Sequence, residues 1–206
     1  LDKSLFVDLT DEDWTRLYYI SKLHDLAHLV GDAVLKNKLD CSSEIIDNFD
    51  KQLITSVYRY QSLQYGLNEI RQLLNDEKIP FIPLKGAVLR NLYPQPWMRT
   101  SCDVDILIHE TDLPQAIVAL NRKGYFQNDQ TAHDISFIIG SNVHLELHHS
   151  LIEEGRIGKA EQLLTHIWNY AKPIDDSAEY VLDDEMFYYY HLAHMAKHLE
   201  GGGGCG

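Results

Sequence analysis

The sequence predicts an α+β protein in which a small mixed β-sheet is flanked by helical segments at both ends of the chain. Apolar residues recur at three- and four-residue steps before residue 78 and again after residue 159, which is the spacing of amphipathic helices. Between these stretches, short apolar or alternating runs are typical of strands. We therefore predict a helical N-terminal region at residues 1–78, a sheet-bearing core at 79–150 and a helical C-terminal region at 151–206.

Two long helical stretches account for the N-terminal region. The first begins at Asp11 or Asp13, either of which can cap a helix that continues to Val30. A second stretch from Glu44 to Asn75 keeps the same apolar spacing, and it predicts either one long helix or two helices with a kink near Gly66. The polar residues between them form the link.

The strand signals lie in the middle of the chain. Residues 79–84 are apolar and contain prolines, which suits an edge or terminal strand. Residues 103–109 predict a strand with Asp103 and Asp105 on one face and apolar residues on the other. Residues 135–139 and 143–148 predict two further strands, joined by a Gly-Ser-Asn hairpin turn at 140–142.

Helices complete the predicted core and the C-terminal region. The helix after residue 109 is expected to be capped by Thr111, to carry Pro114 in its first turn and to end at Gly124. Further helices are predicted over residues 159–170 and 184–199. The glycine-rich residues 201–206 are typical of a flexible loop, which leaves open a longer natural chain.

Composition excludes several classes of function. The chain has 18 basic and 31 acidic residues, a net charge of −13, and this acidic balance disfavours a nucleic-acid partner because phosphates are repelled. No apolar run reaches the roughly 18 residues of a membrane span, and no signal peptide is visible. Cys41, Cys102 and Cys205 form neither a disulfide framework nor a CxxC motif, so we expect a cytoplasmic protein.

Three carboxylates suggest a metal site. Asp103 and Asp105 project side by side from one strand, and Glu146 projects from the polar face of another. If the two strands are neighbours the three groups converge, which is costly without a cation because like charges oppose ionisation. Such oxygen ligands suit Mg²⁺ or Mn²⁺. The alternative is a solvated pair of aspartates, against which the apolar flanking residues indicate a buried strand.

A possible phosphate-binding turn lies upstream of these carboxylates. Lys85 and Gly86 stand between the predicted strand at 79–84 and a short helix at 87–93. Backbone N–H groups at the start of a helix can cradle phosphate, and glycine allows a close approach.

A family resemblance is carried by motifs between residues 82 and 148. They are Ile82-Pro83-Leu84-Lys85-Gly86-Ala87, Tyr93, Arg99-x-Ser101-x-Asp103-Val104-Asp105-Ile106-Leu107-Ile108 and His144-Leu145-Glu146-Leu147-His148. In these motifs the chain resembles the uncharacterised nucleotidyltransferase family of bacteria, which is similar to the polymerase-beta-like nucleotidyltransferase superfamily. The resemblance covers about residues 78 to 200.

The resemblance implies a fold and an activity. It implies a polymerase-beta-like sheet and the transfer of a nucleoside monophosphate from an NTP, such as ATP, to an unidentified hydroxyl acceptor with release of pyrophosphate. By it, Asp103, Asp105 and Glu146 are catalytic and hold Mg²⁺ or Mn²⁺, while Lys85 and Gly86 contact the triphosphate. Ala87 stands where the superfamily usually has serine or glycine. The alternative is a catalytically weak or inactive nucleotide-binding module of the same fold.

Other residues have two interpretations each. Arg99 and Ser101 are expected to contact the triphosphate or sugar, or else to belong to a solvated loop. Trp97 and Met98 could stack on a base or close the core.

The histidines leave a third function open, a zinc-dependent hydrolase. Two sets cluster in the sequence, and they are His191, His194 and His198, and His144, His148 and His149. The alternative for both sets is packing and hydrogen bonding. His194 is also expected to contact substrate.

Overall fold

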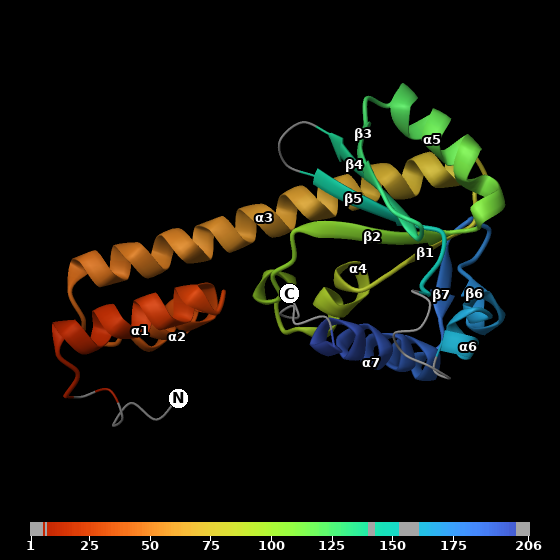
Figure 1. The fold of residues 1–206 in the computed structure, drawn as a ribbon. Helices are drawn as coiled ribbons and strands as arrows, with labels where there is room; N and C mark the ends of the chain where they lie inside the picture. The colour runs from red at the N-terminus through yellow and green to blue at the C-terminus, as the bar shows by residue number, and fades with distance from the viewer. Residues whose placement is uncertain (1–5, 7, 140–142, 153–160, 201–206) are drawn as a thin grey trace. The chain divides into compact units, whose positions relative to one another are not determined.

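The described chain divides into two units. A computed structural model describes residues 6, 8–139, 143–152 and 161–200 (Figure 1). One unit contains residues 1–61 and 90–100, and the other contains residues 62–89 and 101–206. Helix α3 (Ser43–Asp76) contributes its first part to one unit and its second part to the other.

A five-stranded mixed sheet organises the second unit. Its strands are β1 (Phe81–Pro83), β2 (Asp103–Ile108), β3 (Phe126–Gln130), β4 (Asp134–Ile139) and β5 (Val143–His148). Their order is β1-β2-β5-β4-β3, in which β2 and β5 are parallel and the other neighbours are antiparallel. This confirms the predicted α+β class with a mixed sheet. The proline-bearing strand β1 lies at the edge of the sheet, as predicted, because proline cannot donate to a neighbouring strand.

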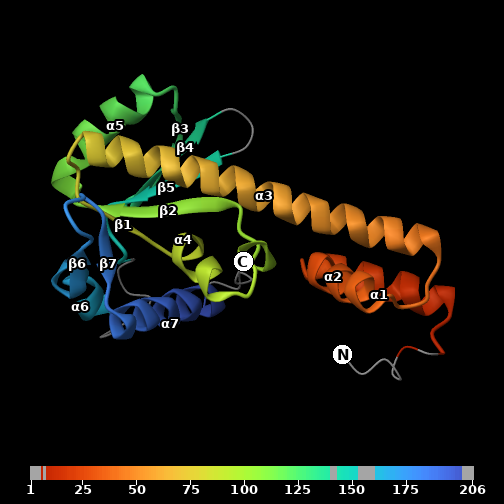
Figure 2. The ribbon, with the colours of Figure 1, turned by 180° about the vertical axis from the view of Figure 1, so that it is seen from behind.

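Both faces of the sheet are covered by helices (Figures 1 and 2). On one face, Val104 and Ile106 of β2 pack in a core with the second part of α3 and with α5 (Leu113–Arg122). On the other face, Leu107 of β2 packs in a second core with α6 (Glu161–Leu164) and α7 (Asp184–Glu200). Polar groups on that second face are therefore at least partly enclosed, from Asp105 with 1% exposure to Glu146 with 29%.

The first unit is a helical assembly. Its elements are α1 (Asp11–Leu23), α2 (Ala27–Asn37), the first part of α3, and 3-10 turns at Arg90–Leu92 and Pro96–Met98. The hydroxyl of Ser56 donates to the carbonyl of Trp97 at 2.8 Å, and Nε2 of His28 lies 3.0 Å from the carbonyl of Met98. These bonds fix the 90–100 segment to the helices.

The predicted single helix from Asp11 or Asp13 to Val30 is wrong. Asp25 adopts a left-handed conformation (φ 53°) between α1 and α2, which breaks the helix. The N-cap is Thr10, whose hydroxyl accepts from the N–H of Asp13 at 3.2 Å, while the carboxylate of Asp13 accepts from the N–H of Thr10 at 3.0 Å. Asp13 therefore completes a capping box rather than serving as the cap itself.

Several other local predictions need correction. The cap of α5 is Asp112 rather than Thr111, which lies in a 3-10 turn at Glu110–Asp112. The strands β3, β6 (Ala171–Pro173) and β7 (Tyr180–Leu182) were not predicted. All five residues of β3 are exposed, so no apolar alternation marks it.

Other predictions extend beyond what the structure describes. The predicted helix over 159–170 becomes α6 followed by a 3-10 helix at Ile167–Tyr170, and its first two residues lie outside the described chain. The hairpin turn at 140–142 and the tail at 201–206 also lie outside the described residues.

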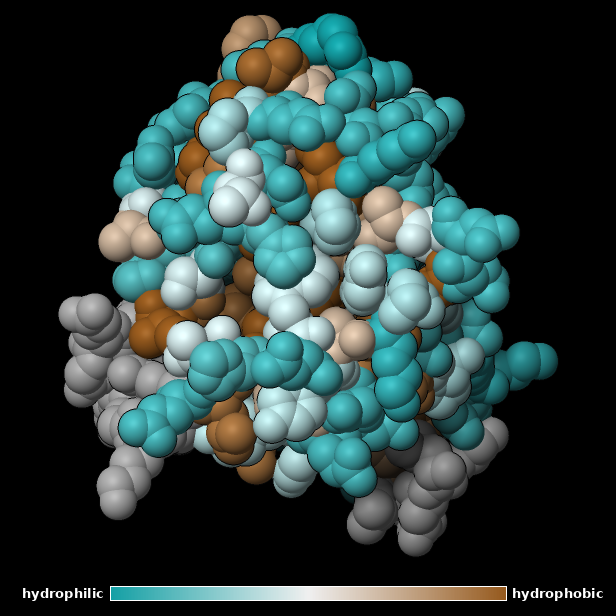
Figure 3. All heavy atoms as spheres, turned by 90° about the vertical axis from the view of Figure 1, so that its right-hand side faces the viewer, coloured by the Kyte–Doolittle hydropathy of each residue, from teal (hydrophilic) through white to brown (hydrophobic). Residues whose placement is uncertain are grey.

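In Figure 3, hydrophilic residues cover most of the visible face, and hydrophobic residues show only in smaller areas between them. Within the described part of the chain, every helix is too short or too polar to cross a bilayer.

Gly66 allows close packing rather than a kink. Helix α3 is one continuous helix, and a Cβ at Gly66 would lie 2.7 Å and 2.8 Å from the two methyl groups of Val143. We expect Gly66→Ala to reduce the free energy of unfolding by about 1–2 kcal/mol, because overpacking outweighs the gain in helix propensity of about 1 kcal/mol. Urea unfolding measures this change. In the double variant, Val143→Ala should restore the stability that Gly66→Ala removes. A Gly66→Ala single variant that is more stable than the wild type would contradict the account.

Candidate active site

The parallel register of β2 and β5 brings the predicted acidic residues to one face. Asp105 is directly opposite Glu146, and Asp103 is opposite His144. Because side chains two residues apart on a strand share a face, Asp103, Asp105 and Glu146 all project from the same side of the sheet. The two strands are thus neighbours, which is the condition that the sequence left open.

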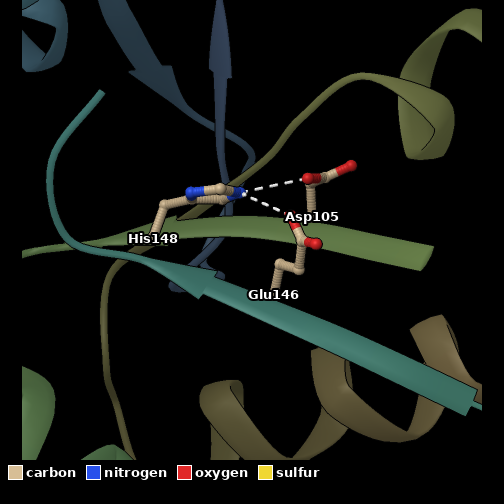
Figure 4. A group of neighbouring side chains, drawn as sticks. All are labelled: Asp105, Glu146 and His148. Carbon is tan, nitrogen blue, oxygen red and sulfur yellow. Dashed lines mark hydrogen bonds and ion pairs between the residues drawn. The ribbon is translucent and has the colours of Figure 1, made fainter. Parts of the chain in front are cut away.

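A histidine joins this group. Nε2 of His148 lies 3.0 Å from Oδ1 of Asp105 and 3.5 Å from Oε2 of Glu146 (Figure 4). Potential metal-donor atoms of these three residues all lie within 4.8 Å of one another, and no other such group occurs among the residues that the structure describes. Asp103 is not part of the group, although its strand position places it on the same face.

Lys85 neutralises part of the acidic charge. Its Nζ lies 2.7 Å from Oδ1 of Asp105 and 4.0 Å from Oε2 of Glu146. The residue has a left-handed backbone (φ 39°), which is uncommon for a side chain other than glycine and costs roughly 1–2 kcal/mol. The turn is held by a bond of 2.9 Å from the N–H of Leu84 to the carbonyl of Asp105. This strained turn therefore carries the ammonium group that contacts the buried carboxylate.

The three carboxylates have different affinities for protons. Burial opposes ionisation of Asp105, but the hydrogen bond from His148 and the charge of Lys85 outweigh it and hold the pKa of Asp105 well below its usual range. Burial and the charge of Asp105 raise the pKa of Asp103 and that of Glu146. The site thus has one firmly ionised carboxylate and two that would ionise more readily beside an added cation.

Helix α7 contributes Tyr190 near these charges. The side chain is 3% exposed, and burial together with the charges of Asp105 and Glu146 raises its pKa well above the usual value. The ring of His194 lies 6.0 Å from the ring of Tyr190. His194 is half-buried, and its predicted contact with substrate stays a prediction.

The remaining predicted site residues fall in different places. Gly86 is buried and begins α4 (Gly86–Leu89), and Ser101 is half-buried two residues before β2. Arg99 belongs to the helical unit, where its guanidinium donates to the carbonyl of Thr100 at 3.4 Å. Trp97 and Met98 belong to the same unit.

The described histidines of α7 give no support to the alternative of a zinc site. Among the described residues, His191 and His194 are not members of a group of three metal donors. The side chain of His198 lies outside the described part of the chain. His144 and His149, of the other set, are likewise not in the group that contains His148.

His148 was predicted only as a member of a histidine set that left a zinc site open, and Tyr190 was not a predicted site residue. The alternation of the strand placed His148 on the face of Glu146, so its position could be read from the sequence. Its contact with Asp105 could not, because that contact depends on the pairing of β2 with β5. No sequence signal distinguished Tyr190 from the two tyrosines before it.

Comparison with known proteins gives a family match over nearly the whole chain. Residues 10–205 match the family model described as "Uncharacterised nucleotidyltransferase". A solved structure with some similarity is the solution structure of the antibiotic-resistance factor ANT(2'')-Ia, with 14% identity, a TM-score of 0.35, and coverage of 73% of this chain and 87% of that chain. At this TM-score the likeness supports no further conclusion. The search of curated proteins found no match.

Proposed function

The chain belongs to the uncharacterised nucleotidyltransferase family, and on that premise we propose that it transfers a nucleoside monophosphate from an NTP to a hydroxyl acceptor and releases pyrophosphate. One observation carries the proposal. Asp105 and Glu146 are register partners on two parallel strands, beside the ammonium group of Lys85. Asp105 is 1% exposed and lies among other acids, and the single ammonium group of Lys85 offsets only part of their negative charge, so a bound cation would stabilise the group further.

The donor set fits a divalent cation. Asp103, Asp105 and Glu146 supply carboxylate oxygens, and two of the three have raised pKa values that an added positive charge would lower. We propose that they hold Mg²⁺ or Mn²⁺. Bound there, the ion would offset phosphate charge and lower the pKa of the acceptor hydroxyl.

The protein's own groups would bind the triphosphate and receive the proton. Lys85 offers an ammonium group to the triphosphate, and Gly86, which has no side chain, allows the phosphates a close approach to the backbone. Glu146 is the proposed base, because it is the register partner of Asp105 at the proposed metal site and its side chain is 29% exposed, so an acceptor hydroxyl can reach it. The acceptor oxygen forms a bond to the α-phosphorus, the bond to the pyrophosphate oxygen breaks, and the acceptor proton passes to Glu146.

A second candidate is a nucleotide-binding module without turnover. The observation that favours it is Ala87, which is 4% exposed and has no hydroxyl to offer to a phosphate. The two candidates share the binding step and differ only in whether product forms.

A transfer assay tests the proposal. Each NTP, labelled at the α-phosphate, is incubated with the protein, Mg²⁺ or Mn²⁺, and separate pools of sugars, other small hydroxyl compounds, lipid precursors, proteins and RNA. We expect pyrophosphate and a labelled product with at least one NTP and one pool, and no product when EDTA is present. Metal-dependent NTP binding without product in any pool would favour the binding module and contradict the transfer reaction.

A further inference from the structure

We propose that His148 is itself a metal ligand of this site, that Asp134 orients its ring, and that the site consequently prefers Mn²⁺ to Mg²⁺. This inference rests on the proposed function, since it concerns the same site. It goes further because it adds a nitrogen donor and a supporting carboxylate that the acidic triad does not contain, and it names which ion the donors favour.

The first argument is the direction of Nε2. This nitrogen lies 3.0 Å from Asp105 and 3.5 Å from Glu146, so it faces the same small volume as the two carboxylates (Figure 4). The His148 side chain is 10% exposed, so the ring is enclosed within the site and has little contact with solvent. A cation placed among the donor atoms of the three residues would therefore meet one nitrogen and carboxylate oxygens. It would replace the hydrogen bond between Nε2 and Asp105 and compete with the ammonium group of Lys85 for Oδ1 of Asp105.

The second argument is the environment of Nδ1, the other ring nitrogen of His148. Nδ1 of His148 faces Oδ2 of Asp134 at 3.9 Å, and Asp134 on β4 is the register partner of His148. Histidine ligands commonly present their second nitrogen to a carboxylate, which fixes the ring and increases the basicity of the ligating nitrogen. At 3.9 Å the contact is longer than a hydrogen bond, so Asp134 acts on the ring through its charge. Asp134 is thus a positioning residue.

The third argument is a polar group with no partner beside Glu146. Ser136 of β4 is the register partner of Glu146 and shares its face of the sheet. The residue is 8% exposed, and its Oγ has no hydrogen-bond partner among the described residues. A buried hydroxyl without a partner is uncommon, and a polar group bound at this edge of the site would satisfy it.

The chemistry of the donors determines the choice of ion. Mg²⁺ strongly favours oxygen ligands in a near-ideal octahedron and gives up its waters reluctantly. Imidazole suits transition metals, and Mn²⁺ also accepts carboxylates readily. A site with one imidazole and several carboxylates should therefore bind Mn²⁺ more tightly than Mg²⁺.

Electron paramagnetic resonance of Mn²⁺ tests this inference on the full chain. The loss of the free Mn²⁺ signal gives the affinity, added Mg²⁺ gives the preference, and electron spin-echo modulation detects nitrogen bonded to bound Mn²⁺. The variants are His148→Gln and Asp134→Asn, with His149→Gln as the matched control. Asp105→Asn should lose the Mn²⁺ binding that occurs at this site, which distinguishes it from binding elsewhere on the protein. Circular dichroism checks that each variant folds.

The expected results are specific. Wild type and His149→Gln should show nitrogen modulation, and Mg²⁺ should displace Mn²⁺ only in more than tenfold excess. His148→Gln should lose the modulation and weaken Mn²⁺ binding at least tenfold, with the preference over Mg²⁺ reduced. Asp134→Asn should keep the modulation and weaken Mn²⁺ binding about 10-fold, within the range for residues that support a ligand.

Other results would overturn the inference. Mn²⁺ binding that Asp105→Asn abolishes, but that shows no nitrogen modulation in the wild type, would make His148 only a counter-ion and leave the proposed function intact. Unchanged binding in Asp134→Asn would remove Asp134 from the account. Absence of Mn²⁺ binding to the wild type, with or without a non-hydrolysable NTP, would contradict both the inference and the proposed function.

Discussion

Replacement of Asp105 by Asn is expected to lower nucleotidyl transfer by on the order of 10³-fold, the upper range for loss of one preorganised electrostatic group. Asp105 is the most buried of the three acids and contacts both Lys85 and His148, so its charge cannot be supplied by another residue. The amide keeps the size and shape of the carboxylate, removes its charge and replaces one acceptor oxygen by a donating NH₂ group. Pyrophosphate release under saturating NTP and metal measures the effect.

Two measurements separate a chemical defect in Asp105→Asn from unfolding. The first is urea unfolding, which should show a folded protein. The second is the titration of Glu146, whose pKa should fall in the variant because the neighbouring negative charge is gone. Asp129→Asn, at an exposed position of β3, is the matched control and should retain full activity. Unchanged transfer by Asp105→Asn would remove this residue from the mechanism.

Replacement of Lys85 by Met is expected to reduce the free energy of unfolding by about 2–3 kcal/mol near neutral pH. Removing one partner of a buried ion pair typically costs about 3–5 kcal/mol. The loss is smaller here because the Lys85 side chain is 17% exposed and His148 still contacts Asp105. Methionine fills similar space without the charge. Urea unfolding of the metal-free protein gives the difference between wild type and variant.

The pH dependence of that difference follows from the two pKa shifts. The pKa of Lys85 is raised, despite burial, by the charge and hydrogen bond of Asp105, so its contribution is full below about pH 10.4 and is lost as pH rises further. The pKa of Asp105 is lowered, so its contribution is present above about pH 3.9 and is lost as pH falls through the lower folded value. The difference should therefore be largest between about pH 4 and pH 10.

A matched lysine controls for the general effect of removing a positive charge. Lys172→Met, at an exposed position of β6, should change stability by less than about 0.5 kcal/mol. A Lys85→Met variant as stable as wild type at pH 7 would mean that the ion pair with Asp105 contributes nothing.

The elements with strong local patterns could be predicted from the sequence. The strand over 103–109 was evident from its apolar run, and β2 spans Asp103–Ile108. The long helix over 44–75 was evident from its spacing, and α3 spans Ser43–Asp76. The break at Asp25 was not evident, because a left-handed aspartate leaves the apolar spacing on both sides intact.

The site required information that no single stretch contains. Each strand showed which of its own side chains share a face, so Asp105 and Glu146 could be named separately. Their pairing depends on β5 inserting between β2 and β4, which is a property of the whole sheet. The left-handed backbone at Lys85 could not be predicted from the sequence either, because it is held by contacts with Asp105 from a different strand.

The boundaries of the regions stay a prediction. The sequence placed one boundary at residue 78, where helical spacing ends. Residues 90–100 pack with the N-terminal helices through the bonds from Ser56 and His28 to Trp97 and Met98. Packing of a loop against a helix that is distant in the sequence cannot be recognised from the amino-acid composition of either segment.

Calorimetric titration of a non-hydrolysable NTP tests the central claim most directly, because that claim is the binding of an NTP through a divalent ion at Asp105 and Glu146. The titration is performed with Mg²⁺, with Mn²⁺ and with EDTA, for the wild type, Glu146→Gln and the control Asp129→Asn. We predict that the wild type and the control bind the NTP only when a divalent ion is present, and that Glu146→Gln binds at least tenfold more weakly. Equal affinity in EDTA, or equal affinity in Glu146→Gln, would contradict the account.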